Sequence, residues 1–199
     1  MSSIHDLVEA LKSKAPEYLD LLTAQTDEEF EEAFLPLLEK GVTHLEKNKK
    51  NFEELDEEGL SAVLAGSMTV PGLSVLQEAH SNGHVDLTFE ADHCCPARKK
   101  LGEAKIYSGA AYHFGGLKQL LGRYTTGREG RGLLIVYVRK QNIEGLVKKL
   151  RVRMNEESPH NQQGAATDHK FKWSFCTAHT HTSGSQVSVD HVGCNLFHD

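Results

Sequence analysis

The sequence Leu-Gly-Glu-Ala-Lys-Ile-Tyr at residues 101–107 decides how this chain can be organised. Polar and apolar side chains alternate along it, which is typical of a β-strand with two unlike faces. Glu103 and Lys105 therefore lie on one face of the predicted strand, and Ala104 and Ile106 lie on the other. A carboxylate and an ammonium group held side by side in this way form the centre of the candidate site.

A second alternating run at residues 84–89 contains Asp86. If this run pairs with the first strand around the loop at residues 91–99, the carboxylates of Asp86 and Glu103 reach the same place. Carboxylate oxygens are the ligands that magnesium prefers, and manganese is the expected substitute. A lysine beside them can orient the attacking water or help to deprotonate it. The chemistry indicated is metal-assisted hydrolysis of a phosphodiester bond.

The order of the following segments extends this motif. A helix is predicted at residues 110–125, with Gln119 in its second half, and an apolar strand follows at residues 132–138. With Asp86 and the Glu-x-Lys strand in front of them, these segments resemble the PD-(D/E)XK nuclease superfamily, specifically its small bacterial members. The resemblance covers about residues 57–155.

The resemblance implies a role for each matching residue. It implies that Asp86 and Glu103 hold the metal ion, that Lys105 serves the water, and that Gln119 supports the site. In such nucleases a glutamate on the first core helix can assist metal binding. Glu57 is the best match to that place, although an acidic helix start exposed to solvent explains it equally well.

The fold that the resemblance implies is a restriction-endonuclease-like three-layer α/β/α sandwich. We expect a mixed central sheet with its strands in chain order, a helical extension at residues 1–52, and a nuclease-like domain at residues 53–199. Apolar periodicity predicts further helices at residues 4–11, 16–22, 54–67 and 143–154. It predicts further strands at residues 73–78, 170–177 and 186–197, with a loop at residues 155–168.

The longest predicted helix follows Thr26, which forms a capping box with Glu29. Phe34, Leu38 and other apolar residues recur on one side of it. Pro36 removes a backbone donor from its middle, so we expect the helix to kink or to split there.

Charge is divided unevenly along the chain, whose formal net charge is −6. Residues 1–60 carry 6 basic and 16 acidic residues, whereas residues 98–153 carry 14 basic and 3 acidic ones. Local positive charge is what a phosphate backbone needs, so the segment with the site is also the predicted nucleic-acid-binding segment. Its candidate contacts are Arg123, Arg128, Arg131, Lys148 and Lys149.

The sequence shows no signal for a membrane span, for secretion or for disulfide bonds. No apolar run approaches the roughly 18 residues of a membrane span, and the first residues do not resemble a secretion signal. We therefore expect no membrane partner and a cytoplasmic location. The four cysteines show no regular framework, and a bond between the adjacent Cys94 and Cys95 would be strained, so reduced thiols are expected.

The function predicted from these observations is a magnesium-dependent endonuclease, for which DNA is favoured over RNA. Family likeness suggests restriction or phage defence, with a homodimer or a partner protein selecting the target. The alternative is a noncatalytic nuclease-fold module that binds nucleic acid or a protein. A third possibility is a zinc protein organised by the C-terminal side chains His179, His181, His191, His198 and Cys194. Otherwise these histidines are expected at the surface.

Overall fold

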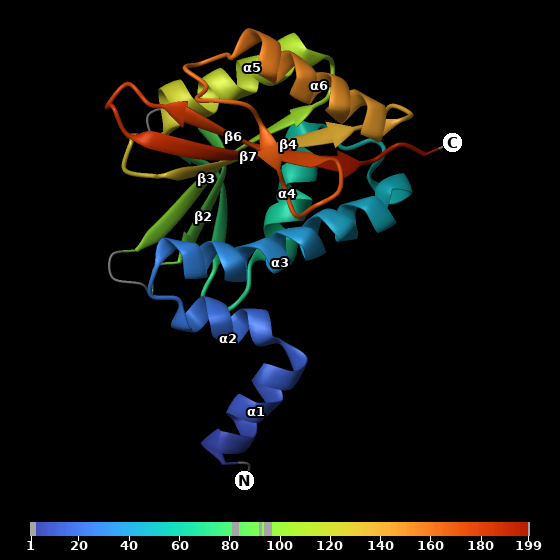
Figure 1. Cartoon of the computed structure of the whole chain (residues 1–199). Helices are drawn as coiled ribbons and strands as arrows, with labels where there is room; N and C mark the ends of the chain where they lie inside the picture. The colour runs from blue at the N-terminus through green and yellow to red at the C-terminus, as the bar shows by residue number, and fades with distance from the viewer. Residues whose placement is uncertain (1–2, 81–83, 92, 94–96, 199) are drawn as a thin grey trace.

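The computed structural model describes residues 3–80, 84–91, 93 and 97–198. In this part of the chain, strands form one seven-stranded mixed sheet, and helices lie on both of its faces (Figure 1). The helices are α1 (Ile4–Lys14), α2 (Pro16–Thr23), α3 (Asp27–Lys47), α4 (Glu57–Met68), α5 (Ala110–Gln119) and α6 (Ile143–Glu157). The strands are β1 (Ser74–His80), β2 (His84–Ala91), β3 (Arg98–Ile106), β4 (Arg131–Val138), β5 (Thr167–Asp168), β6 (Ser174–Thr180) and β7 (Gln186–Asn195). The predicted α/β class with N-terminal helices is confirmed.

The strands occupy the sheet in the order β1-β2-β3-β4-β7-β6-β5. Strands β1, β2 and β3 are antiparallel neighbours, β3, β4 and β7 run parallel, and β6 and β5 return antiparallel. The expectation that all strands follow chain order is therefore wrong at the C-terminal end. The sequence of β7 explains the difference, because its residues His191 to Cys194 are buried on both faces and belong inside the sheet.

Two helical layers enclose the sheet. The core beneath α2, α3 and α4 contains Phe34, Leu64 and Phe89, and the core beneath α5 and α6 contains Leu117 and Leu150. Alternation along β3 sends every second side chain into each core. In Figure 1, α5 and α6 lie on one side of the sheet, and α3 and α4 lie on the other.

The N-terminal helices begin where the sequence predicts. Thr26 and Glu29 form the capping box of α3, which is therefore confirmed. The helix continues through Pro36 as a single element of 21 residues, so the expectation that Pro36 splits it is wrong. Because α3 shares its core with the sheet, Phe34 is fully buried against Phe89. The division of the chain at residue 52 stays a prediction.

The C-terminal half departs from the predicted boundaries at three places. The helix over residues 110–125 ends as α5 at Gln119 and continues as a wider π-type turn at Leu120–Tyr124. Residues 170–173 are not part of a strand, because Trp173 has a left-handed backbone with φ of 55° immediately before β6. The predicted loop at residues 155–168 contains the end of α6 and the short strand β5.

Two sequence predictions concern thiols and membranes. Cys176 and Cys194 are free cysteines, whereas Cys94 and Cys95 lie outside the described residues. Among the residues that the structure describes, no helix has the length and apolar character needed to cross a membrane.

A buried ion cluster ties three distant elements together on the α3 face of the sheet. The ammonium group of Lys100 on β3 lies 2.7 Å from a carboxylate oxygen of Glu31 on α3 and 2.7 Å from one of Asp190 on β7. Lys100 is fully buried, so removing it would leave two carboxylates in a poorly solvated place without their cation.

We predict that Lys100→Ala lowers the free energy of unfolding by about 3–5 kcal/mol, the usual cost of breaking a buried ion pair on one side. The neighbouring Lys99→Ala is the control, because Lys99 is half exposed and pairs with Glu90 at the surface. It should cost less than about 1 kcal/mol. Urea denaturation of both variants measures the difference, and equal losses would contradict the structural role of Lys100.

Candidate active site

The candidate site lies where β3 leaves its neighbour β2. The paired residues of β2 and β3 end at Leu87 and Gly102, and beyond this point the strands diverge. Asp86 occupies the space that opens, and its carboxylate accepts a hydrogen bond of 2.9 Å from the backbone N–H of Ala104. A side chain thus replaces the strand pairing that the backbone of β3 lacks there.

Glu57 is held at the same end of β3. Asp56 caps α4 by accepting the N–H of Gly59 at 2.8 Å, which makes Glu57 the first residue of the helix. One oxygen of Glu57 accepts the backbone N–H of Ile106 at 2.8 Å. The structure therefore places Glu57 in the site, whereas the sequence left a solvated helix start as an equal alternative.

Lys105 is the centre of the site. Its ammonium nitrogen lies 2.6 Å from Glu103 Oε1, 3.1 Å from Glu57 Oε1 and 3.8 Å from Asp86 Oδ2. The structure thus brings together three of the four residues that the sequence proposed for catalysis, Asp86, Glu103 and Lys105, and places Glu57 from α4 beside them. Three carboxylates around one ammonium group form a strongly charged and largely buried cluster.

Burial decides the protonation of this cluster. The side chain of Glu103 is fully buried, and burial together with the negative charge of Asp86 raises the pKa of Glu103 to about 7. Burial also raises the pKa of Asp86. Burial alone would lower the pKa of Lys105, but its hydrogen bond and ion pair with Glu103 raise that pKa above the ordinary value. Lys105 is therefore an ammonium ion and acts by its charge rather than as a base.

The acidic oxygens suit a small hard cation. No protein donor reaches Glu103 Oε2, although this atom is buried, and the carboxylate of Asp86 lies beside the Glu103 carboxylate. Burial is the main cause that raises both pKa values, and a cation bound beside the two carboxylates would favour their charged forms. Asp86 and Glu103 would hold magnesium through oxygen, with water completing the coordination shell.

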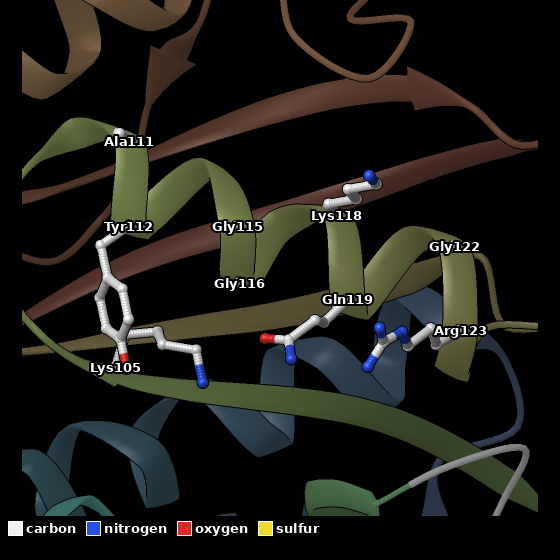
Figure 2. A pocket seen from close by; sticks show the side chains of 9 residues that line it. All are labelled: Lys105, Ala111, Tyr112, Gly115, Gly116, Lys118, Gln119, Gly122 and Arg123. Atoms are coloured by element: carbon white, nitrogen blue, oxygen red, sulfur yellow. The ribbon is translucent and has the colours of Figure 1, made fainter.

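A cleft of about 630 Å³ opens beside Lys105 under helix α5 (Figure 2). Figure 2 shows Lys105 and Tyr112 at one end of this cleft and Gln119 and Arg123 at the other. In Figure 2 the side chains of Lys105, Gln119 and Arg123 lie on the same side of the helical segment, whereas the side chain of Lys118 points away from them. The lining residues are Lys105, Ala111, Tyr112, Gly115, Gly116, Lys118, Gln119, Gly122 and Arg123.

Glycine residues give the cleft its shape. A Cβ atom at Gly116 would lie 3.0 Å from Lys105 Cγ, so glycine allows α5 to pack directly onto the lysine. At Gly115 and Gly122 a Cβ atom would meet nothing within 4 Å, so these positions leave the hollow open. We infer that Gly116 serves packing, whereas Gly115 and Gly122 keep the cleft accessible.

The five predicted nucleic-acid contacts do not form one surface. Arg123 lines the cleft, but Arg128 and Arg131 line another hollow beside the start of α3, where Arg131 lies 3.3 Å from Glu28. Lys148 and Lys149 are exposed on α6, where Lys148 pairs with Glu144. Tyr112 and Lys118 also line the cleft but were not among the predicted site residues. Tyr112 lies seven residues before Gln119, a spacing that places both on one helix face, and no such signal exists for Lys118.

A chain of buried side chains fixes α5 over the sheet. His113 on α5 lies 2.8 Å from His191 on β7, and Thr177 on β6 lies 2.7 Å from both His191 and His179. The expectation that the C-terminal histidines lie at the surface is therefore wrong for His179 and His191, which are buried. Thr177 joins the two histidines because β6 and β7 direct their odd-numbered side chains toward α5.

The donor and acceptor of each hydrogen bond among these buried histidines and Thr177 can be assigned, because the row of side chains ends on a carbonyl oxygen. The carbonyl of His160 can only accept, so His179 donates to it from Nδ1 and accepts the Thr177 hydroxyl at Nε2. Thr177 then accepts from His191, which in turn accepts from Nε2 of His113. All three rings are neutral in this arrangement, and burial accordingly lowers the pKa of each.

The histidine chain also bears on the zinc alternative. His179 and His191 face α5, whereas Cys194 belongs to the core on the opposite face of the sheet. His181 contacts Ser183, and His198 lies 2.6 Å from Glu53. Among the described residues, these side chains do not converge on one point.

Comparison of the chain with protein-family models, with curated proteins and with solved structures finds no match. The resemblance to PD-(D/E)XK nucleases therefore rests on the order of Asp86, Glu103, Lys105 and Gln119 in the sequence.

We predict that the histidine chain makes the protein acid-sensitive. Burial lowers the pKa of His113 from 6.5 to about 3, so the unfolded chain takes up a proton first as the pH falls. The contribution of His113 to stability is therefore fully present above pH 6.5 and is lost as the pH falls below that value. His113→Gln keeps the donor to His191 without a titrating group. Wild type should lose roughly 1.4 kcal/mol more per pH unit below pH 6.5 than this variant.

Urea denaturation at pH 7, 6 and 5 provides this measurement. The difference between the two proteins isolates His113, because the titration of Glu103 is common to both. Parallel pH profiles for wild type and variant would contradict the neutral buried state of His113.

Proposed function

We propose that the protein is a magnesium-dependent nuclease of the PD-(D/E)XK type, with the restriction-endonuclease-like fold. The observation that carries this proposal is the buried carboxylate of Glu103. It lies beside Asp86 and Lys105, lacks a donor at Oε2, and belongs to a cluster that borders a basic cleft. An ion cluster with only a structural role would gain nothing from an unpaired buried oxygen.

The topology around the site supports the same proposal. Antiparallel β2 and β3 present Asp86 and the Glu-x-Lys pair, and α5 then connects β3 to the parallel strand β4. Gln119 at the end of α5 lines the cleft above Lys105. These placements agree with the order of elements in the nucleases that the sequence resembles.

The residues of the site have separable tasks in phosphodiester hydrolysis. Bound magnesium supplies a Lewis acid and lowers the pKa of its water ligands. Asp86 and Glu103 hold the ion, and Glu57 keeps Lys105 in place through its carboxylate. The Lys105 ammonium group orients the water and stabilises the negative charge that develops on the phosphate. Gln119 at the end of α5 and Arg123 in the π-type turn that follows it position the scissile phosphate.

The cleft supports a nucleic-acid substrate. Lys118 and Arg123 provide positive charge along it, and the exposed ring of Tyr112 provides a surface on which a base can stack. We favour DNA over RNA, with restriction or phage defence as the setting, from the resemblance alone. A homodimer or a partner protein would then select the target.

We predict that Lys105→Ala lowers the rate of DNA cleavage about 100-fold or more, as the loss of one group that stabilises transition-state charge usually does. Magnesium binding should persist, because both acidic ligands remain. Glu103→Gln should instead weaken magnesium binding, since it removes an anionic oxygen. Lys99→Ala, on the same strand but exposed, is the matched control and should cut at the wild-type rate.

Plasmid, linear duplex, single-stranded DNA and RNA are the substrates, each with magnesium, with manganese or with chelator. Undiminished cutting by the wild-type protein in chelator would refute the proposed site. Cutting by Lys105→Ala at the wild-type rate would refute it as well. Tight binding of nucleic acid without any cutting by wild type would favour the noncatalytic module.

We predict that the cleft, rather than α6, binds the phosphate backbone. The double variant Lys118→Ala, Arg123→Ala should reduce the slope of log affinity against log salt by about two, because each lost phosphate contact contributes roughly one unit. The double variant Lys148→Ala, Lys149→Ala removes the same charge from α6 and should leave the slope unchanged. Fluorescence anisotropy with labelled DNA measures both, and the reverse result would move the interface to α6.

A further inference from the structure

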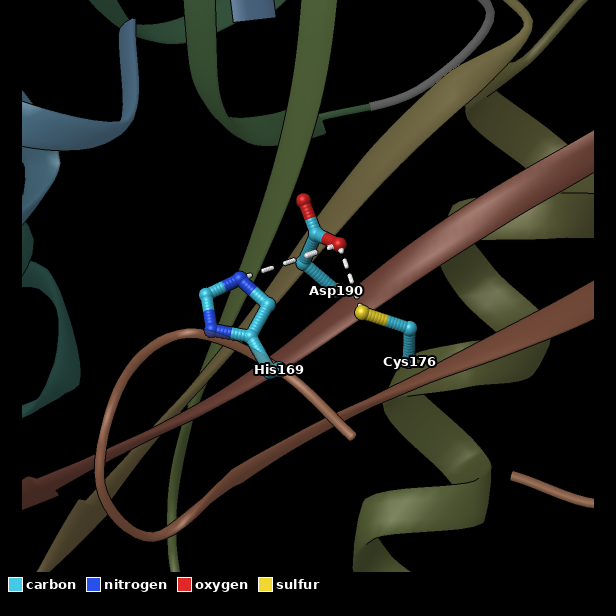
Figure 3. Close-up of side chains that lie close together, drawn as sticks. All are labelled: His169, Cys176 and Asp190. Atoms are coloured by element: carbon cyan, nitrogen blue, oxygen red, sulfur yellow. Dashed lines mark hydrogen bonds and ion pairs between the residues drawn. The ribbon is translucent and has the colours of Figure 1, made fainter. Parts of the chain in front are cut away.

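A second cluster of polar side chains lies on the α3 face of the sheet, opposite the candidate active site. It consists of His169 after β5, Cys176 on β6 and Asp190 on β7 (Figure 3). Cys176 and Asp190 are paired residues of neighbouring strands, so the sheet itself holds them side by side. His169 reaches the pair from the segment that precedes β6, and its side chain is almost fully buried.

The separations between these side chains are close to those of a tetrahedral metal site. Asp190 Oδ1 lies 3.3 Å from Cys176 Sγ and 3.9 Å from His169 Nε2. The ligand atoms of all three residues lie within 4.8 Å of one another. Zinc bonds of about 2.0–2.3 Å at tetrahedral angles place neighbouring ligand atoms roughly 3.3–3.6 Å apart. Small side-chain adjustments would therefore bring all three onto one ion.

Asp190 is already oriented for this task. Its Oδ2 lies 2.7 Å from the buried Lys100 ammonium group, which also contacts Glu31 at 2.7 Å. Its Oδ1 faces His169 and Cys176 in Figure 3. Lys100 thus fixes the carboxylate from behind, as the outer partners of metal ligands commonly do. One ammonium group beside two carboxylates leaves one negative charge in this buried place.

We propose that His169, Cys176 and Asp190 bind a zinc ion, with water in the fourth position. A thiolate, an imidazole and one carboxylate are the donors that zinc accepts, whereas magnesium avoids sulfur. The ion and a Cys176 thiolate would together neutralise the remaining charge of Glu31, Asp190 and Lys100. This site is separate from the Asp86–Glu103 pair, which offers oxygen alone on the other face of the sheet.

In the absence of a metal ion, two of the three ligand atoms carry protons. The Cys176 thiol donates to Asp190 Oδ1, and the N–H of Phe171 donates to His169 Nδ1 at 3.0 Å, which leaves the ring proton on Nε2. Zinc binding releases the thiol proton to solvent. The ring proton moves from Nε2 to Nδ1 through solvent, and His169 gives up its bond with Phe171. One proton is released for each ion bound.

Cobalt is the probe that tests this site, because a cobalt–thiolate bond has a charge-transfer absorption in the near ultraviolet. Cys94 and Cys95 are replaced by serine in all proteins, so that their thiols cannot contribute. Metal-free protein in this background should develop the absorption with one equivalent of cobalt, and zinc should abolish it. Cys176→Ser should lose it, whereas the matched control Cys194→Ser, a buried thiol with no histidine or aspartate partner in this cluster, should keep it.

Two further variants keep the outcome interpretable. His169→Gln should weaken cobalt binding at least about tenfold even if Cys176→Ser fails to fold, because it removes one of three protein ligands. Glu103→Gln should leave cobalt absorption unchanged, so failure at one metal site is distinguishable from failure at the other. No absorption in the background protein, or absorption that persists in Cys176→Ser, would overturn the proposal.

Discussion

The candidate active site depends on the ion pairs that the ammonium group of Lys105 makes with three carboxylates. Glu57, Asp86 and Glu103 come from three elements, and their carboxylates would repel one another in a buried space without a cation between them. Lys105 supplies that cation from the middle of the sheet. Burial, together with the negative charge of Asp86, nevertheless raises the pKa of Glu103 to about 7. We propose that a divalent ion balances these carboxylates in the working protein.

Strand β3 carries two lysines that each gather carboxylates from other elements. Lys100 faces α3 and gathers Glu31 and Asp190, whereas Lys105 faces α5 and gathers the carboxylates of the site. The two lysines are five residues apart, an odd number, so strand alternation sends them to opposite faces. Helix α5 completes the arrangement because Gly116 lets it pack onto Lys105, and the buried histidine chain holds it over β6 and β7.

Local pattern predicted much of this site. Alternation at residues 101–107 placed Glu103 and Lys105 on one face, and the turn between two strands brought Asp86 beside them. The long-range pairings were beyond the sequence. Lys100 meets Asp190 across 90 positions, and nothing in a single chain indicates that partner. The inner position of β7 and the burial of His191 likewise depend on which strands pair, which periodicity does not specify.

The titration of the Glu103 side chain tests the central claim most directly, because it reports on the metal site without depending on a substrate. Carbon-13 NMR of the labelled carboxyl group measures this pKa with and without saturating magnesium. We expect a pKa of about 7 without the ion, and a value below the ordinary 4.5 once magnesium neutralises the carboxylate cluster. A titration curve that magnesium leaves unchanged would show that Glu103 is no ligand, and would contradict the account.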